Sequence, residues 1–346
     1  MAAAAALQRL AARALLSLPA PILRLLAGGG VVYKAGRTLD PRLQFLAAQA
    51  RAAPPLERGT PQEARRGEQA MLAVLSAPLV PGVRCEALSV PGAAGDIPAR
   101  LYRPEDQDPA APLMVWAHMG GGVIGGLDTS HAFAGLLARI ARGPVLSLDY
   151  RLAPEHRFPA GLDDVLAAYL WARSHAADWG ASGVAIGGDS MGGNFAAVVC
   201  QALKRLGEPQ PVLQLMVYPA TDFASQSESM ALFADAFPLS RPLMDWFMGH
   251  YLGPDDDPTD RRLSPLRTAD LAGLAPAILA TAGFDPLVDQ GEAYARALKD
   301  AGVSCVYRRY DSLCHAFTAM TGAVPAADAA CREIAALVRE AYAERT

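Results

Sequence analysis

Ser190 is the side chain in this sequence whose surroundings best fit a nucleophile. It lies between a short apolar run at 184–186 and an apolar stretch at 195–203, in the segment Gly188-Asp189-Ser190-Met191-Gly192. The run is typical of a buried strand and the stretch of a helix, so Ser190 falls at a strand-to-helix turn. Flanking glycines leave room for a sharp turn that projects the hydroxyl. We therefore predict a reactive serine; a glycine-rich loop with an incidental serine is the alternative.

A serine hydroxyl becomes an effective nucleophile when a neighbouring base accepts its proton, and histidine is the expected base. Two histidines follow Ser190: His250 lies in an apolar segment, and His315 follows the last expected strand. With this kind of turn the order along the chain is serine, acid, histidine. We predict His315 as the base and interpret His250 as a residue on the face of a cap helix.

The acid that orients the histidine is expected after the preceding strand, where Asp285 follows the apolar run 277–282. Asp289 and Asp311 are competitors. Asp289 better fits the first turn of the next helix, where a carboxylate is favoured. Asp311 lies at the end of the last expected strand, close in sequence to His315. We predict Asp285.

A reacting carbonyl also needs fixed N–H donors for its developing negative charge. The backbone N–H of Met191, directly after the serine, is one expected donor. The others are expected from a glycine loop that follows an apolar strand, His118-Met119-Gly120-Gly121-Gly122. A plain turn is the alternative interpretation of this loop.

These residues need elements that end at one edge of a sheet. Apolar runs typical of strands occur at 84–90, 97–102, 113–117, 145–148, 184–186, 212–218, 277–282 and 304–310. Helical stretches separate most of them, at 132–142, 161–174, 195–203 and 289–299, and a last helix is expected at 326–342. This alternation predicts an α/β fold with a mostly parallel central sheet and helices on both faces. Such sheets place their sites at the carboxyl ends of the strands.

Two segments fall outside the alternation. Residues 1–75 look helical, with breaks expected near Pro19, at Pro54-Pro55 and at Arg65-Arg66-Gly67, and we expect an N-terminal cap or lid. Residues 220–265 form an apolar insertion, a helical cap whose side chains are either ordinary core or the wall of an acyl pocket. The catalytic domain is then 76–219 together with 266–346.

The N-terminal 39 residues are basic and carry leucines at helical spacing, among them Leu7 and Leu10. No apolar run is long enough for a membrane-spanning helix. A secretory signal fits poorly, because the first positive charge is Arg9 and Arg13 interrupts the apolar stretch. Reversible contact with a membrane surface is the minor alternative to a lid.

Composition narrows the function classes. The chain is 52% hydrophobic, which excludes a disordered protein, and its net charge of −4 provides no basic footprint for nucleic acid. The five cysteines, which show no CxxC pair, are Cys85, Cys200, Cys305, Cys314 and Cys331. We expect neither a disulfide framework nor a zinc site, and interpret the cysteines as small core residues of a cytoplasmic protein.

Several motifs in the same order resemble the hormone-sensitive lipase family of α/β-hydrolases, in its bacterial esterase branch. His118-Met119-Gly120-Gly121 is similar to the family's HGGG motif, and residues 150–160 match its YRLAPE-x-x-FPA signature. Residues 188–194 are similar to GDSAGGN, while 285–287 and 315–317 resemble the DPL and HGF segments. The resemblance covers about residues 90–320.

The resemblance implies an α/β-hydrolase fold with Ser190 as nucleophile, Asp285 as acid and His315 as base. It implies that Gly120, Gly121 and Met191 supply the oxyanion N–H groups. His118, Tyr150, Arg151, Glu155 and His156 become supporting residues. We also expect a substrate pocket lined by Met119, Phe233, Phe237, Met244 and Phe247.

Two residues depart from the family's pattern: Met119 replaces a glycine of HGGG, and Met191 replaces the alanine after the nucleophile. A positive φ at Met119 would strain its backbone by about 1 kcal/mol or more. The long Met191 side chain is expected to fill part of the pocket.

The sequence therefore predicts a serine carboxylesterase that hydrolyses short- to medium-chain acyl or aryl esters through an acyl-enzyme, without a metal or organic cofactor. A ligand-binding protein without catalysis and an acyltransferase are the alternatives. A small-molecule ester is the expected partner, nucleic acid is not, and a homodimer is considered. Peripheral membrane association or secretion is the alternative to a cytoplasmic location.

Overall fold

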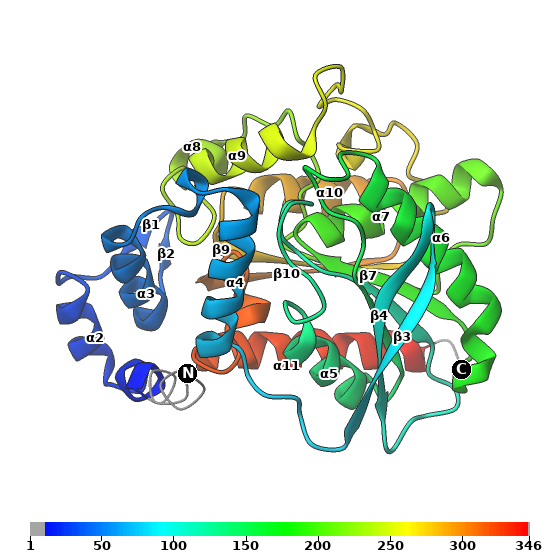
Figure 1. Ribbon diagram of the computed structural model, residues 1–346, viewed down its shortest axis with the longest axis horizontal. Helices are drawn as coiled ribbons and strands as arrows, with labels where there is room; N and C mark the ends of the chain where they lie inside the picture. Colours follow the sequence, from blue (N-terminus) through cyan, green and yellow to red (C-terminus); the bar gives the residue numbers. More distant parts are fainter. Residues whose placement is uncertain (1–10, 345–346) are drawn as a thin grey trace.

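An eight-stranded sheet forms the centre of the molecule in the computed structural model, which describes residues 11–344 (Figure 1). The strand order is β10-β9-β8-β7-β5-β6-β4-β3. The strands are β3 (Val83–Gly92), β4 (Gly95–Pro104), β5 (Leu113–Ala117), β6 (Val145–Leu148), β7 (Val184–Asp189), β8 (Gln214–Val217), β9 (Ala277–Phe284) and β10 (Cys305–Cys314). Neighbouring strands run parallel from β6 to β10, and β3 and β4 add an antiparallel hairpin. The predicted mostly parallel sheet is confirmed.

The inner strands are short apolar runs because both of their faces are covered. Every residue of β5, β7 and β9 is buried. The outer hairpin strand β3 instead exposes most of its residues. The register pairs Ala117 with Gly188 and Val217 with Ala280, so β5, β7, β8 and β9 end near the same edge.

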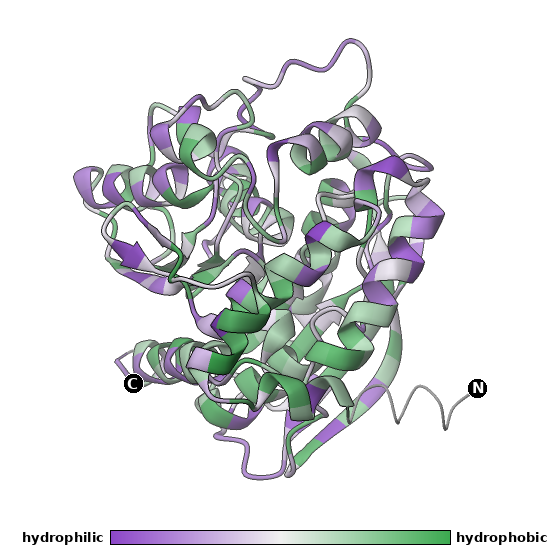
Figure 2. Cartoon of the chain, turned by 90° about the vertical axis from the view of Figure 1, so that its left-hand side faces the viewer, coloured by the Kyte–Doolittle hydropathy of each residue, from purple (hydrophilic) through white to green (hydrophobic). Residues whose placement is uncertain are grey.

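Helices cover both faces of the sheet, as predicted. On one face α5 (His131–Ala141) and α11 (Pro325–Ala343) pack together and share a core with alternate strand residues such as Trp116. On the other face α6 (Ala160–His175), α7 (Met191–Leu206) and α10 (Val288–Asp300) pack on the intervening residues, such as Val115. Green, apolar residues dominate the central helices and strands in Figure 2, and purple residues gather on outer helices and loops.

The segment before the sheet holds α2 (Ala20–Leu26), the hairpin β1 (Tyr33–Lys34) and β2 (Arg37–Thr38), α3 (Pro41–Ala52), a short 3-10 helix (Leu56–Arg58) and α4 (Pro61–Leu75). Figure 1 shows α4 between the outer helices α2 and α3 and the sheet. Local sequence sets these helices. Asp40 caps α3, and Thr60 and Glu63 form a capping box that begins α4.

The insertion after β8 contains α8 (Glu228–Leu232) and α9 (Arg241–Tyr251). Helix α9 contacts the 3-10 helix of the N-terminal segment, so the two segments meet above the sheet (Figure 1). Further single-turn 3-10 helices lie at Ala176–Trp179, Pro265–Arg267 and Phe317–Met320. The proposed boundaries of the cap regions stay predictions.

Three sequence expectations are corrected or bounded by the structure, and one element was not expected. Helix α4 continues without a break across Arg65-Arg66-Gly67, because its capping box and its buried apolar face stabilise the whole helix. The β1–β2 hairpin was not predicted. Cys85 is exposed and Cys305 half-buried, so only the other three cysteines are core residues. Leu7, Arg9 and Leu10 lie outside the described residues.

None of the helices in residues 11–344 combines the length and apolar character needed to cross a membrane.

Candidate active site

Ser190 occupies a strained turn between β7 and α7. Its backbone has φ 54° and ψ −113°, a left-handed conformation that costs a non-glycine residue about 1–3 kcal/mol. The neighbouring glycines make this turn fit. A Cβ atom on Gly188 would collide with the backbone of Gly192, and one on Gly192 would collide with the carbonyl of Ala117 in β5. The tight packing of strand against helix holds Ser190 in place.

His315 joins Ser190 to Asp285 through two hydrogen bonds. The Ser190 Oγ lies 2.9 Å from His315 Nε2, and His315 Nδ1 lies 2.7 Å from Asp285 Oδ2. All three residues are buried, and Asp285 is 0% exposed. With Nδ1–H donating to the carboxylate, Nε2 is the acceptor for the serine proton. The structure thus brings together the three residues predicted as nucleophile, acid and base.

The three residues meet because each directly follows a parallel strand. Strand β7 ends at Asp189, β9 at Phe284 and β10 at Cys314. Parallel strands direct their carboxyl ends to one edge, so residues from distant parts of the sequence converge there. Asp285 is further fixed by the Leu287 N–H, which donates to its Oδ1 at 2.8 Å.

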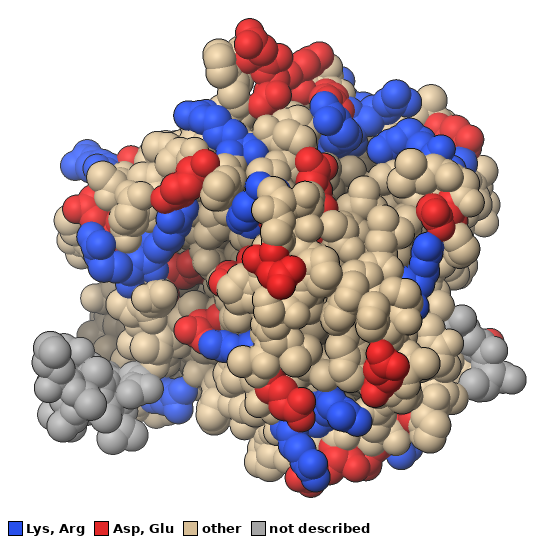
Figure 3. Space-filling model, turned by 45° about the vertical axis from the view of Figure 1, so that its right-hand side comes forward, with Lys and Arg blue, Asp and Glu red and all other residues tan. Residues whose placement is uncertain are grey.

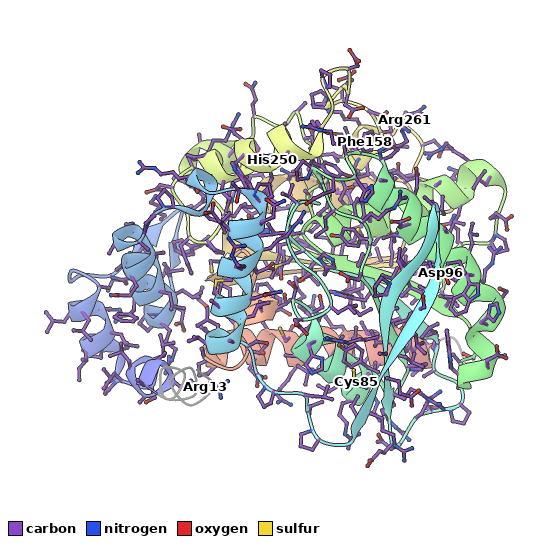
Figure 4. All side chains as sticks on the ribbon, in the orientation of Figure 1. Arg13, Cys85, Asp96, Phe158, His250 and Arg261 are labelled. Carbon is purple, nitrogen blue, oxygen red and sulfur yellow. The ribbon has the colours of Figure 1, made fainter. Side chains whose placement is uncertain are left out.

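The competing residues have other partners. Asp289 accepts a hydrogen bond from the Ser229 N–H at 2.7 Å, at the start of α10. Asp311 lies within β10, not at its end, and pairs with Arg309 on the surface. His250 lies on α9 (Figure 4). Its ring packs against that of Trp246.

The glycine loop after β5 faces the same site. Gly120 and Gly121 have φ of 124° and 63°, and their N–H groups donate to no residue within 11–344. Met191 is the first residue of α7, where helix geometry leaves backbone N–H groups without intrahelical partners. Three N–H donors therefore border the cavity that Ser190 enters. Met119 does not have a positive φ, so the strain considered for it is absent.

Comparison with known proteins shows the family to which the chain belongs. A family described as "alpha/beta hydrolase fold" matches residues 114–319. The carboxylic ester hydrolase LipN of Mycobacterium tuberculosis is 46% identical over 310 residues, which cover 87% of this chain and 82% of LipN. This chain belongs to the α/β-hydrolase family. An ethyl acetate hydrolase of Pseudomonas putida is 37% identical over 67% of this chain and 74% of that protein.

Solved structures of related hydrolases share the fold of this chain. An alpha/beta hydrolase enzyme from the metagenome of Lake Arreo superposes on this hydrolase with a TM-score of 0.84 at 39% identity, covering 87% of this chain and 98% of that one. A thermostable esterase from Pseudomonas putida gives 0.83 at 29% identity, covering 89% and 98%. The predicted hormone-sensitive-lipase-like family, the α/β-hydrolase fold and a carboxylic ester hydrolase are confirmed.

His118 and Tyr150 support the glycine loop of the hydrolase. Their rings stack with centroids 4.2 Å apart, and the Tyr150 hydroxyl donates to the His118 carbonyl at 2.7 Å. His118 Nδ1 lies 2.6 Å from the Met119 carbonyl. Burial lowers the pKa of His118 to about 4, so its ring is neutral at pH 7. Arg151 forms an ion pair with buried Asp164 at 2.7 Å.

Asp189, directly before Ser190, is a residue of the candidate site that sequence reasoning missed. Its Oδ2 accepts hydrogen bonds from Thr318 at 2.7 Å and from Tyr218 at 3.0 Å. Thr318 follows His315 by three residues, so its hydrogen bond to Asp189 connects the segment after β10 to the turn that holds Ser190. Burial raises the pKa of Asp189 to about 6. A charged residue between a buried strand and the serine was the available signal.

The cavity above Ser190 has a volume of about 1100 Å³. Four of the five predicted pocket residues line it: Met119, Phe237, Met244 and Phe247. Phe233 does not. It packs against Phe284, 5.6 Å between ring centroids, and borders a separate cavity of about 320 Å³. Residues of α3 and α4, in the segment for which an N-terminal cap or lid is predicted, also line the larger cavity.

Proposed function

We propose that this carboxylic ester hydrolase acts through Ser190, with His315 as base and Asp285 as the orienting acid. The hydrogen-bonded line from Ser190 Oγ through His315 to Asp285, at the floor of a large cavity, carries the proposal. Asp285 stabilises the charge that His315 acquires when it accepts the serine proton.

In the first half of the reaction, Ser190 Oγ forms a bond to the ester carbonyl carbon while its proton moves to His315 Nε2. The carbonyl electron pair moves onto oxygen, where the N–H groups of Gly120, Gly121 and Met191 stabilise it. As the carbonyl re-forms, the bond to the alkoxide breaks and His315 donates its proton to the leaving oxygen. An acyl group remains on Ser190.

In the second half, His315 takes a proton from water as the water oxygen attacks the acyl carbon. Collapse of this second tetrahedral species releases the carboxylic acid and returns the proton to Ser190. Every step uses this chain's own groups and water.

We propose short- to medium-chain acyl or aryl esters as substrates. Methionine and phenylalanine side chains border the reacting serine, among them Met119, Met191 and Phe247, and they favour an apolar acyl or aryl group. The Pseudomonas putida relative is named for hydrolysis of ethyl acetate, an ester of this size.

We further propose a cytoplasmic protein that acts without a nucleic-acid partner. Acidic and basic side chains are interspersed over the face that Figure 3 presents, which favours no polyanion. All five cysteines are unpaired, which fits a reducing compartment. The homodimer stays a prediction, which the mass of the protein in solution tests.

Replacement of Ser190 by alanine tests the proposed nucleophile. We expect kcat for p-nitrophenyl butyrate to fall about 10⁴-fold or more, because no other group forms the acyl-enzyme. A fluorophosphonate probe should label the wild-type protein at Ser190 and leave Ser190→Ala unlabelled.

Exposed Ser174, at the far end of α6, provides the matched control. Ser174→Ala should keep both the rate and the labelling. Wild-type protein that never reacts with the probe would instead indicate a ligand-binding protein, and full activity in Ser190→Ala would refute the assignment.

A further inference from the structure

Two side chains of α4 contact the segment that carries the oxyanion donors. Arg65 donates to the carbonyls of Val123 and Ala153, each at 2.9 Å, and forms an ion pair with Glu155 at 2.7 Å. Glu68 lies three residues later, on the same face of the helix. It accepts a hydrogen bond from the Thr129 hydroxyl at 3.1 Å. Helix α4 is thus attached to both ends of the loop that follows Gly120.

Glu68 is unusual because it is an acidic residue buried in the wall of the substrate cavity. Its side chain is 6% exposed, and the residue lines the same cavity as Ser190 and His315. Burial raises its pKa to about 7, opposed by hydrogen bonds from Thr129 and the Gly125 backbone. The proposed reaction gives this carboxyl no role.

The contact continues from Glu68 into the loop. Thr129 Oγ1 donates to Glu68 and accepts from the Gly126 N–H at 3.0 Å. Gly125, beside Gly126, has φ 99° and approaches the His118 ring and the Met119 carbonyl too closely to carry a Cβ atom. The link from Glu68 through Thr129 therefore ends where the loop folds back onto its own start.

This loop needs outside support because its backbone is intrinsically flexible. Gly120, Gly121, Gly122 and Gly125 all have positive φ, and glycine loses more conformational freedom on ordering than any other residue. Helix α9 presses on one side of the loop through Phe247. Helix α4 contacts the loop through the hydrogen bonds of Arg65 and Glu68.

We propose that Glu68 is a positioning residue, which acts through Thr129. It holds residues 118–126, here called the oxyanion loop, in their reactive geometry. The inference rests on the proposed role of Gly120 and Gly121 as donors. The proposal gives the N-terminal segment a role in the active site. Helix α4 belongs to that segment, and it contacts a loop that lies far from it in the sequence. Oxyanion donors displaced by a fraction of an ångström lose transition-state stabilisation, so the link acts on kcat.

Titratable side chains from neighbouring elements also interact with Glu68. Asp189 at the end of β7 and Tyr150 after β6 interact with it electrostatically. Arg65 is engaged by Glu155. Glu68 thus has hydrogen-bond donors at its carboxyl and an acid, Asp189, as its charged neighbour.

The test compares Glu68→Ala, Glu68→Gln, Thr129→Val and the double variant Glu68→Ala/Thr129→Val. We expect Glu68→Ala and Thr129→Val each to lower kcat for p-nitrophenyl butyrate about tenfold, with KM within twofold of wild type. The double variant should be no slower than the slower single variant, because both single changes break the same Glu68–Thr129 hydrogen bond. Glu68→Gln should keep at least half of kcat, since its amide oxygen accepts the same hydrogen bonds.

Gln69→Ala is the matched control, an exposed position next to Glu68 on α4 that should keep wild-type kcat. Fluorophosphonate titration counts reactive sites, so a misfolded fraction is corrected for in every variant. Glu68→Gln as slow as Glu68→Ala, a change in KM alone, or multiplying effects in the double variant would each refute the positioning role. Failure of wild type to react with the probe would instead refute the proposed nucleophile.

Discussion

Met191 contributes to the site in two separate ways. Its backbone N–H stands at the start of α7 beside Ser190, and its side chain is buried and borders the substrate cavity. Substitution of the side chain leaves the N–H in place, so the two contributions can be separated. Met119 faces the same cavity, and its sulfur lies 3.8 Å from the Tyr218 hydroxyl. The two methionines therefore line the same cavity as Ser190.

We predict that Met191→Ala shifts the preference of the enzyme toward bulkier acyl groups. The ratio of kcat/KM for p-nitrophenyl hexanoate to that for the acetate should rise about tenfold, because one methylene in an apolar pocket is worth about 1–3 kcal/mol. A chain-length series from acetate to octanoate measures it. An unchanged ratio would show that the side chain does not limit the acyl group.

At the scale of elements, the oxyanion loop contacts two helices from distant parts of the chain, α4 and α9. A Cβ atom on Gly121 would lie 2.5 Å from the ring of Phe247 in α9, and one on Gly122 would lie 2.6 Å from the ring of Tyr251. Arg65 and Glu68 of α4 also contact the loop, through hydrogen bonds. The helices thus shape a segment that has little conformational preference of its own.

Gly121→Ala should lower kcat about 100-fold, because the added methyl group displaces the loop and its donors. Gly121→Ala/Phe247→Ala should recover part of this loss. Recovery stays incomplete since alanine at φ 63° costs about 1 kcal/mol.

Gly249→Ala on α9 is the control, because a Cβ atom there meets nothing within 4 Å. It should keep wild-type kcat. Equal rates for Gly121→Ala and wild type would show that the loop yields to the methyl group without moving its donors.

At the scale of the whole molecule, the site edge of the sheet buries several ionisable groups without full charge compensation. Burial raises the pKa of Glu68 to about 7 and that of Asp189 to about 6, and it lowers the pKa of His118 to about 4. The two acids destabilise the fold as they ionise, and His118 destabilises it as it becomes protonated. The free energy of unfolding is therefore lowered by the two acids as pH rises and by His118 as pH falls.

Glu68→Gln should raise the thermal midpoint relative to wild type more at pH 8 than at pH 5. The folded-state pKa of Glu68 lies above its ordinary value of 4.5, so wild type is most stable below that value and loses stability as pH rises through about 7. The difference corresponds to about 3 kcal/mol at most. Asp189 and His118 are present in both proteins, so their effects cancel.

Thermal denaturation of both proteins between pH 5 and pH 8 measures this gap. A gap that stays constant with pH would show that Glu68 does not ionise over this range. With the expected outcome, the enzyme keeps a buried carboxyl that costs stability at neutral pH and holds the oxyanion loop in place.

The sequence alone was enough to predict which three side chains gather at the proposed catalytic site. Ser190, Asp285 and His315 each follow an apolar run that reads as a strand, in a fixed order along the chain. Carboxyl ends of parallel strands meet at one edge, so a local pattern was sufficient to predict that these side chains gather. Strand lengths were underestimated at their ends, because β7, β9 and β10 continue through polar or glycine residues to the residue before each site residue.

Tertiary structure alone decided which distant residues surround that chemistry. Glu68 and Thr129 are 61 residues apart, and Asp189 and Thr318 are 129 apart, so no local pattern links either pair. Likewise, tertiary packing places Phe233 at the smaller cavity. It also brings α4 into contact with the oxyanion loop. Periodicity shows which face of an element is apolar, but which neighbour covers that face depends on the three-dimensional fold.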